Sequence, residues 1–147
     1  MLTIQTEILI KKPPAAVYKW VLELDSEKYR GWHPAHKAFR WEGTRVYLNE
    51  EVGRQKLEIK GILISQIPDK ELRFKGRISI MPGYLSMRLE MVPEGTKFIY
   101  EIGVGFRGPL GFISDFLIRR FYRWDSMQKI YKKHMQEEWK ALETVLR

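Results

Sequence analysis

The stretch 98-FIYEIGVGFRGPLG-111 marks the point where the chain changes from strands to helix. Apolar side chains occupy alternate positions from Phe98 through Val104 to Phe106, which is the period of a strand with one buried face. The segment Gly108-Pro109-Leu110-Gly111 ends this alternation, because glycine and proline interrupt regular structure. From there to the C-terminus the apolar spacing predicts a single helix of about thirty residues.

Upstream of this stretch, residues 38–107 consist of short alternating runs separated by turn sequences. Turns are expected at residues 68–70, 81–83 and 93–95, each of which contains proline. These connections are too short for the crossovers that parallel strands need, so the pattern predicts an antiparallel meander.

The first thirty residues predict one strand followed by two short helices. Leu2, Ile4, Ile8 and Ile10 alternate with polar residues, which indicates a half-buried strand. Proline is tolerated in a first helical turn, so the Pro-Pro pair of residues 13–14 fits the start of one helix. Residues 25–26, Asp-Ser, fit the cap of a second helix that ends near Gly31.

This element order, with the segment 10-IKKPPAAV-17 and the terminal helix, resembles the START-like, polyketide-cyclase superfamily. The resemblance covers residues 1–147 and implies one α+β domain with the helix-grip fold. In that fold a curved antiparallel sheet wraps around a long C-terminal helix, and two short helices follow the first strand. A cavity for a hydrophobic small molecule is expected between sheet and helix. Lipid carriers, cyclases and hydrolases all share this fold, so it does not specify an activity.

Composition excludes several classes of chemistry. The chain has no cysteine, so disulfides, thiolate nucleophiles and cysteine-based zinc sites are ruled out. Metal binding would have to use the three histidines together with Asp and Glu. No apolar run approaches the roughly 20 residues of a membrane span, and no secretory leader is evident, so we expect a cytoplasmic protein.

The formal charge of +8 raises the question of nucleic-acid binding. No recognition helix, zinc finger or single-strand-binding motif accompanies the basic residues, so nucleic acid is not expected as a partner. A homo-oligomer remains open. The densest basic cluster is interpreted as a solvated helix face that attracts anions; it comprises Arg119, Arg120, Arg123, Lys129, Lys132 and Lys133.

Two titratable residues lie on the apolar face of the predicted terminal helix. His134 and Glu138 are four residues apart, so they project together. Either they form a buried hydrogen bond, or the helix rotates to let Glu138 reach water, or they share a metal ion. The apolar face on which they fall is formed by Met127, Ile130, Tyr131, Ala141, Leu142 and Val145.

Two further ligands are predicted from other parts of the chain. His33 and His36 follow the second short helix, where the chain enters the sheet, and one of them would supply the third ligand. Glu51 has the same parity as the apolar Leu57 and Ile59, which predicts an inward-facing carboxylate. By the same count Glu50 and Glu58 face water, unless a bulge near Gly53 shifts the register. The predicted metal set is therefore His36 (or His33), Glu51, His134 and Glu138, suited to zinc, with iron or manganese as other options.

The segment 28-KYRGWHPAH-36 resembles the Arg-Tyr-x-x-Trp-His-Pro-x-x-His motif of diacetylphloroglucinol hydrolases, with Lys28 in place of the motif arginine. Those zinc enzymes have the helix-grip fold and cleave a carbon–carbon bond between an aromatic ring and an acetyl group. The resemblance implies the same ligand roles for His36, Glu51, His134 and Glu138.

Three functions follow as hypotheses. The first is a zinc-dependent hydrolase or lyase acting on a phenolic or polyketide-like ketone, and the second is a metal-free carrier of a lipid or polyketide. The third is an interaction protein whose basic helix binds an acidic partner or an anionic membrane surface. For the enzyme, Tyr29 and His33 are the candidate catalytic residues that donate protons or orient substrate. The residues expected to line the ligand pocket are Trp32, Tyr84, Met87, Met91, Phe98, Tyr100, Phe106, Trp124 and Tyr131.

Overall fold

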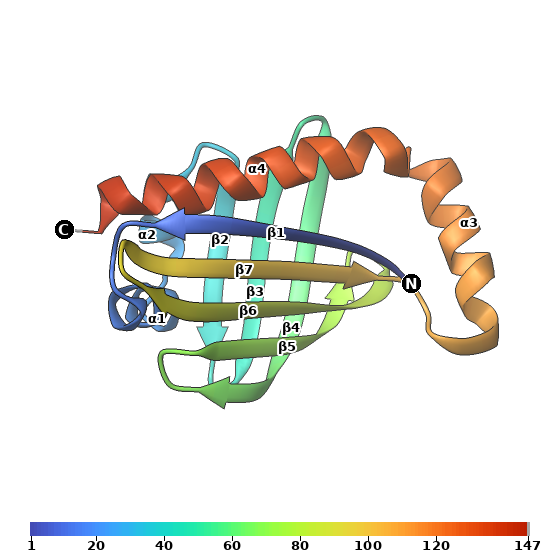
Figure 1. The fold of residues 1–147 in the computed structure, drawn as a ribbon. Coiled ribbons are helices and arrows are strands. Elements are labelled where there is room, and N and C mark those ends of the chain that lie inside the picture. Colours follow the sequence, from blue (N-terminus) through green and yellow to red (C-terminus); the bar gives the residue numbers. More distant parts are fainter. Residues whose placement is uncertain (147) are drawn as a thin grey trace.

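A curved sheet of seven antiparallel strands forms the body of the computed structural model, which describes residues 1–146 (Figure 1). The strands follow the order β1-β7-β6-β5-β4-β3-β2 across the sheet. Every neighbouring pair is antiparallel, which confirms the predicted meander, but the turn expected at residues 81–83 lies at residues 79–80, just before β6. The strands are β1 (Leu2–Ile10), β2 (His36–Glu42), β3 (Arg45–Val52), β4 (Gln55–Ile67), β5 (Glu71–Ile78), β6 (Met81–Val92) and β7 (Gly95–Val104).

The two short helices after β1 are α1 (Pro14–Leu22) and α2 (Ser26–Trp32), as expected. Pro14 is the first residue of α1, where its missing N–H leaves no hydrogen bond unmade. The Asp25 side chain caps α2 by accepting a hydrogen bond of 2.8 Å from the Lys28 amide. This cap fixes the start of α2 and so the path of the chain into β2.

The C-terminal helical region is divided, which corrects the expectation of one uninterrupted helix. A short 3-10 turn, Gly108–Leu110, leads into α3 (Gly111–Phe121), and α4 (Trp124–Val145) follows after a break. At the break Arg123 adopts a left-handed conformation with φ of 48°. Apolar residues continue on both sides and neither glycine nor proline is present at residues 122–123, so the sequence pattern carries no signal for this break.

Helix α4 runs along the sheet, as in a helix grip, and buries one face against it (Figure 1). Met135 and Leu142 on this face are completely buried, and Trp139 stacks on Phe98 of β7 with ring centroids 4.0 Å apart. The same face carries His134 and Glu138, and both are buried. The core therefore forms around α4 and places two titratable side chains inside it.

Two of the residues predicted to line a pocket are exposed. Met91 is 82% exposed because β6 extends beyond the covered part of the sheet near the turn into β7. Phe106 is 46% exposed because it lies after the end of β7, where the chain has left the sheet for the 3-10 turn. Both residues fit the alternation of apolar and polar side chains along a strand. That alternation identifies the inward face of the strand, but not how far other elements pack against it.

Candidate metal centre

Four buried side chains converge from three elements between the sheet and α4. His36 comes from β2, Glu50 from β3, and His134 and Glu138 from α4. One nitrogen or oxygen atom from each can be chosen so that all four lie within 4.8 Å of one another. Two imidazoles and two carboxylates at this spacing form a donor set that suits zinc and also accepts iron or manganese.

The secondary structure itself accounts for the convergence. His134 and Glu138 are one helical turn apart, with His134 Nε2 and Glu138 Oε2 separated by 3.2 Å. His36 and Glu50 are direct partners in the β2–β3 register, so both side chains start from the same place on the sheet. Helix α4 lies over this place and brings its pair to within 2.6 Å of His36, between His36 Nε2 and Glu138 Oε2.

The inward carboxylate of β3 is Glu50, not Glu51 as predicted. Glu50 is 3% exposed, whereas the neighbouring Glu51 faces solvent. The two-residue turn between Val52 and Gln55 pairs Glu50 with Leu57. Inward positions are therefore even-numbered on β3 and odd-numbered on β4, so one parity count across both strands fails. Recognising Gly53-Arg54 as a hairpin turn, with Gly53 at φ of 63°, would have identified Glu50.

Two tyrosines hold the Glu50 carboxylate in place. The Tyr29 hydroxyl donates a hydrogen bond of 3.0 Å to Oε2, and the Tyr131 hydroxyl donates one of 2.6 Å to Oε1. Burial and the charge of Glu50 raise the pKa of both hydroxyls well above the usual value, so both remain protonated donors. Tyr29, a candidate catalytic residue, thus lies beside the cluster as a group that positions Glu50.

Backbone contacts orient the remaining groups. His36 Nδ1 lies 2.9 Å from the Tyr29 carbonyl oxygen, which can only accept a hydrogen bond, so Nδ1 carries a proton. In a neutral ring the lone pair is then on Nε2, which faces the carboxylates. The Trp32 indole donates to the Glu138 backbone carbonyl, which ties α2 to α4 beside the cluster.

The cluster has acceptors that face one another. Neutral His36 Nε2 and ionised Glu138 Oε2 are both acceptors, so their 2.6 Å separation requires a proton or a cation between them. Within residues 1–146, His134 Nε2 is buried without a hydrogen bond of good geometry, although it is 3.2 Å from Glu138 Oε2 and 3.4 Å from Glu50 Oε2. Imidazole nitrogens and carboxylate oxygens that point toward a common centre are the arrangement expected of metal ligands.

The charges of the cluster depend on what occupies its centre. Burial by itself lowers the pKa of His134, but the carboxylates of Glu138 and Glu50 outweigh it and raise that pKa to about 10. Burial likewise opposes ionisation of Glu138, but His134 and His36 keep its pKa below the usual value. The metal-free protein therefore holds a protonated His134 between carboxylates, and a divalent cation would replace that proton.

His33 lies next to the cluster but not in it. Its ring centroid is 4.7 Å from that of His134, and its Nδ1 accepts a 3.0 Å hydrogen bond from the Ala35 amide. Partial burial and the neighbouring His134 and His36 lower its pKa, so it is neutral at pH 7. Between the two histidines that the sequence left open, the structure brings His36 to the carboxylates and leaves His33 at the rim.

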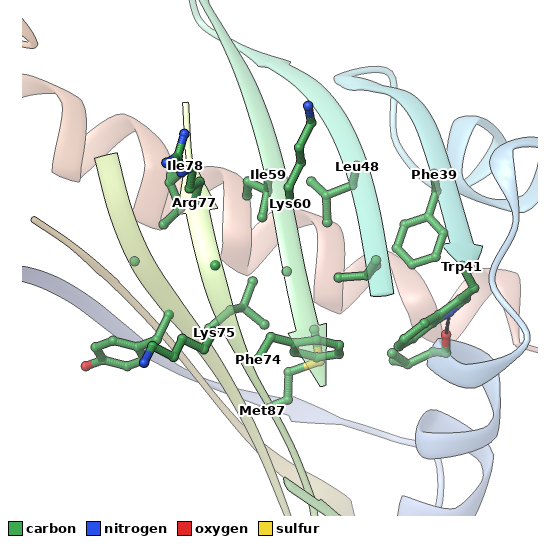
Figure 2. Close-up of a pocket in the computed structure, with 17 residues that line it drawn as sticks. Phe39, Trp41, Leu48, Ile59, Lys60, Phe74, Lys75, Arg77, Ile78 and Met87 are labelled. Atoms are coloured by element: carbon green, nitrogen blue, oxygen red, sulfur yellow. Dashed lines mark hydrogen bonds between the residues drawn. The ribbon is translucent and has the colours of Figure 1, made fainter. Parts of the chain in front are cut away.

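A small apolar cavity lies inside the curve of the sheet, lined from α1 and β2 through β6 (Figure 2). Its volume of about 40 Å³ accommodates a few water molecules, far less than the roughly 300 Å³ of a small-ligand pocket. Phe39 in its wall lies 5.3 Å, ring to ring, from Tyr29, so the cavity lies beside the residues that support the cluster. Larger apolar ligands would have to displace side chains such as Phe39, Trp41, Leu48, Ile59, Phe74 and Met87.

The other predicted pocket residues fall into two groups. Tyr84 and Met87 line the cavity, and the Tyr84 hydroxyl bonds to Glu101. The remaining five are buried but do not line it: Trp32, Phe98, Tyr100, Trp124 and Tyr131. Burial raises the pKa of Tyr100 well above its usual value. The charges of the nearby Glu138 and Glu50 raise it further, so Tyr100 lies close to the cluster. Sequence reasoning missed Trp139, which packs between Trp32 and Phe98.

Comparison with solved structures supports the fold. The chain is similar to TTHA0849 from Thermus thermophilus, with a TM-score of 0.72, 16% identity, and coverage of 97% of this chain and 95% of that one. A START superfamily protein from Mycobacterium smegmatis aligns with a TM-score of 0.64 and 12% identity over 99% and 95% of the two chains. The Polyketide_cyc-like protein Cgl2372 from Corynebacterium glutamicum gives 0.58 and 16% over 98% and 90%. No protein-family model and no curated protein sequence matches the chain.

These likenesses establish the helix-grip fold that START and polyketide-cyclase-like proteins share. The identities are too low to transfer an activity. Within residues 1–146, no helix has both the length and the apolar character needed to cross a membrane.

Proposed function

We propose that this protein binds zinc through His36, Glu50, His134 and Glu138. We further propose that it is a hydrolase or lyase acting on a hydrophobic phenolic or polyketide-like ketone. The observation that carries the proposal is the convergence of four buried side chains, in which the Nε2 atoms of His36 and His134 face the same two carboxylates. Burying two carboxylates costs several kcal/mol, and the cost is met when a cation or protons neutralise them.

The residues present fit a divalent metal. With both imidazoles neutral the four side chains carry two negative charges, which one divalent ion balances. The hydrogen bonds from Tyr29 and Tyr131 to Glu50, and from His36 to a carbonyl, fix the orientation of these ligands before any ion binds. Iron and manganese accept the same donors, so the choice of zinc rests on the resemblance of the 28–36 segment to zinc hydrolases.

When bound, zinc polarises a ketone oxygen and acidifies water. The chain supplies the rest of the chemistry. Cleaving an aryl ketone with water yields a carboxylic acid and an aromatic ring that gains a proton where the acyl group was. His33 is neutral and partly exposed at the rim of the cluster, so it can orient water or carry that proton. Tyr29 and Tyr131 keep Glu50 fixed throughout.

The alternative is a metal-free carrier of a hydrophobic lipid or polyketide. The apolar cavity supports binding of such a molecule, and so does the fold shared with START and polyketide-cyclase-like proteins. A carrier would retain a protonated His134 as a buried ion pair with Glu138 and Glu50. Such a cluster adds nothing to the binding of an apolar ligand, so we favour the metal enzyme.

The test is a hydrolysis assay on zinc-loaded protein with a panel of acylphenols, in which released carboxylic acid is measured by chromatography. We expect turnover by the wild type and by Glu51→Gln, whose carboxylate is exposed, and none by Glu138→Gln. Binding of the same ketones by metal-free protein, without turnover under any metal, would favour the carrier and contradict the enzyme.

A further inference from the structure

Helix α3 presents an apolar face to solvent. Only Gly111, Ser114 and Ile118 on this helix are buried, at the spacing of one helical face. Elsewhere on the helix Phe112 and Phe116, and Phe121 at its last turn, are 73%, 66% and 74% exposed. Figure 1 shows α3 standing away from the sheet at the end where α4 begins. The outward apolar face, here called the α3 face, comprises Leu110, Phe112, Ile113, Phe116, Leu117 and Phe121.

This amount of exposed apolar surface is unusual in a molecule whose other aromatic side chains are mostly buried. It does not arise from a lack of core, because α4 and the sheet bury a continuous cluster of apolar residues. A large apolar patch exposed to solvent marks a site of contact with a protein, a membrane or a ligand.

Positive charge predominates on α3 and in the segments next to it in the sequence. Residues 106–133 contain seven Lys or Arg and only two Asp, of which one pairs with the N-terminal amine and the other with Arg119. Arg119 and Arg120 are exposed on α3 itself. A second copy would bring an identical basic surface against this one, so like charges oppose self-association through this face. An anionic surface is the complementary partner.

We propose that α3 docks in the plane of an anionic lipid bilayer, with the phenylalanines of the α3 face at the level of the acyl chains and the arginines at the phosphates. Helices that combine bulky apolar side chains with Arg or Lys bind this interface, and their long basic side chains extend to the headgroups. The proposal is independent of the metal centre.

Phe106 and Arg107, just before α3, line a surface groove of about 360 Å³. The groove and the internal cavity share Phe74, Gly83 and Tyr84 in their walls, and the paired strands β5, β6 and β7 lie between them. A bilayer docked on α3 would therefore lie beside this groove.

The test is flotation with vesicles of phosphatidylcholine alone or with about 30% phosphatidylglycerol, at low and high salt. We expect binding to the anionic vesicles only, weakened by salt because the attraction is partly electrostatic. The triple substitution Phe112→Ser, Phe116→Ser, Phe121→Ser should reduce the bound fraction at least tenfold. Because these side chains are exposed, circular dichroism and thermal unfolding of the variant should match the wild type.

The matched control is Ile80→Ser with Met91→Ser, since these residues are 79% and 82% exposed and lie outside α3. This variant should bind vesicles like the wild type. Equal binding to neutral vesicles, no binding to either kind, or equal loss in the control would overturn the proposal. A lipid-free wild-type dimer by light scattering that becomes monomeric in the triple variant would also overturn it, and would assign the face to self-association.

Discussion

Replacing Glu50 by Gln tests the metal centre at the position where sequence and structure disagree, and Glu51→Gln is the matched control. The two residues are adjacent and chemically identical, but one is buried in the cluster and the other faces solvent. Gln has nearly the same shape as Glu, so the substitution removes charge and little volume. A difference between the two variants therefore reports the role of the buried carboxylate.

The magnitude follows from the contacts of Glu50. Its oxygens accept hydrogen bonds from Tyr29 and Tyr131, and each bond to a charged group contributes about 1.5–3 kcal/mol. The glutamine amide retains one acceptor oxygen, so the metal-free variant should lose the equivalent of one such bond, about 2 kcal/mol. Glu51→Gln should stay within about 0.5 kcal/mol of the wild type, as expected for an exposed side chain.

Zinc should enlarge the difference in stability between the Glu50→Gln and Glu51→Gln variants. At free zinc 100 times the dissociation constant, binding stabilises the wild type by about 2.7 kcal/mol, which raises Tm by roughly 5–11 °C in a chain of this size. Loss of one ligand should weaken binding at least about 100-fold, more than the loss of a supporting hydrogen bond. At the same zinc concentration the stabilisation then falls to about 0.4 kcal/mol.

The assay is thermal unfolding of both variants with and without zinc, in a buffer that controls free metal. We expect Glu51→Gln to gain as much as the wild type and Glu50→Gln to gain less than about 2 °C. Equal zinc-dependent shifts in the two variants would refute the assignment of Glu50. A loss confined to Glu51→Gln would show that the metal-bound protein has the other register.

Three further outcomes are expected. Because His134 has a pKa of about 10 in the metal-free protein, zinc must displace its proton. Calorimetry in buffers of different ionisation enthalpy should therefore find at least one proton released per ion, and zinc affinity should rise at least about tenfold per pH unit from pH 6.5 to 8; a pH-independent affinity would contradict this. Leu142→Ala removes a fully buried side chain of α4 and should lower the free energy of unfolding by about 2–5 kcal/mol in urea titrations, against less than about 0.5 kcal/mol for the exposed Ile80→Ala; a similar loss in both would argue against α4 as the centre of the core. His33→Gln should retain zinc but lower kcat, and should abolish the acid limb of the pH–rate profile, which in the wild type lies below pH 6.5 because the pKa of His33 is lowered; an unchanged profile would exclude His33 from catalysis.

Much of the fold could be predicted because its signals are local. Alternation in β1 and β7, the proline start of α1 and the Asp25 cap of α2 each depend on a few neighbouring residues. The inward pair His134 and Glu138 was predictable for the same reason, since one helical turn fixes its geometry.

The features that failed depend on structure beyond the local pattern. Glu50 was missed because a two-residue hairpin changes the parity of inward positions between β3 and β4. Met91 and Phe106 obey the strand pattern but lie where nothing covers the sheet. The break between α3 and α4 at Arg123 could not be predicted from the sequence, because the residue with the left-handed conformation is neither glycine nor asparagine.

Metal content of the purified, untagged protein tests the central claim most directly. Elemental analysis should find about one zinc, or one iron or manganese, per wild-type chain and per Glu137→Ala chain. His134→Ala and Glu138→Ala should each lose it, since each removes a ligand from the buried set. Wild-type protein that contains no metal, and that takes up neither zinc nor iron nor manganese on dialysis, would contradict the account and leave the cluster as a protonated ion pair in a carrier.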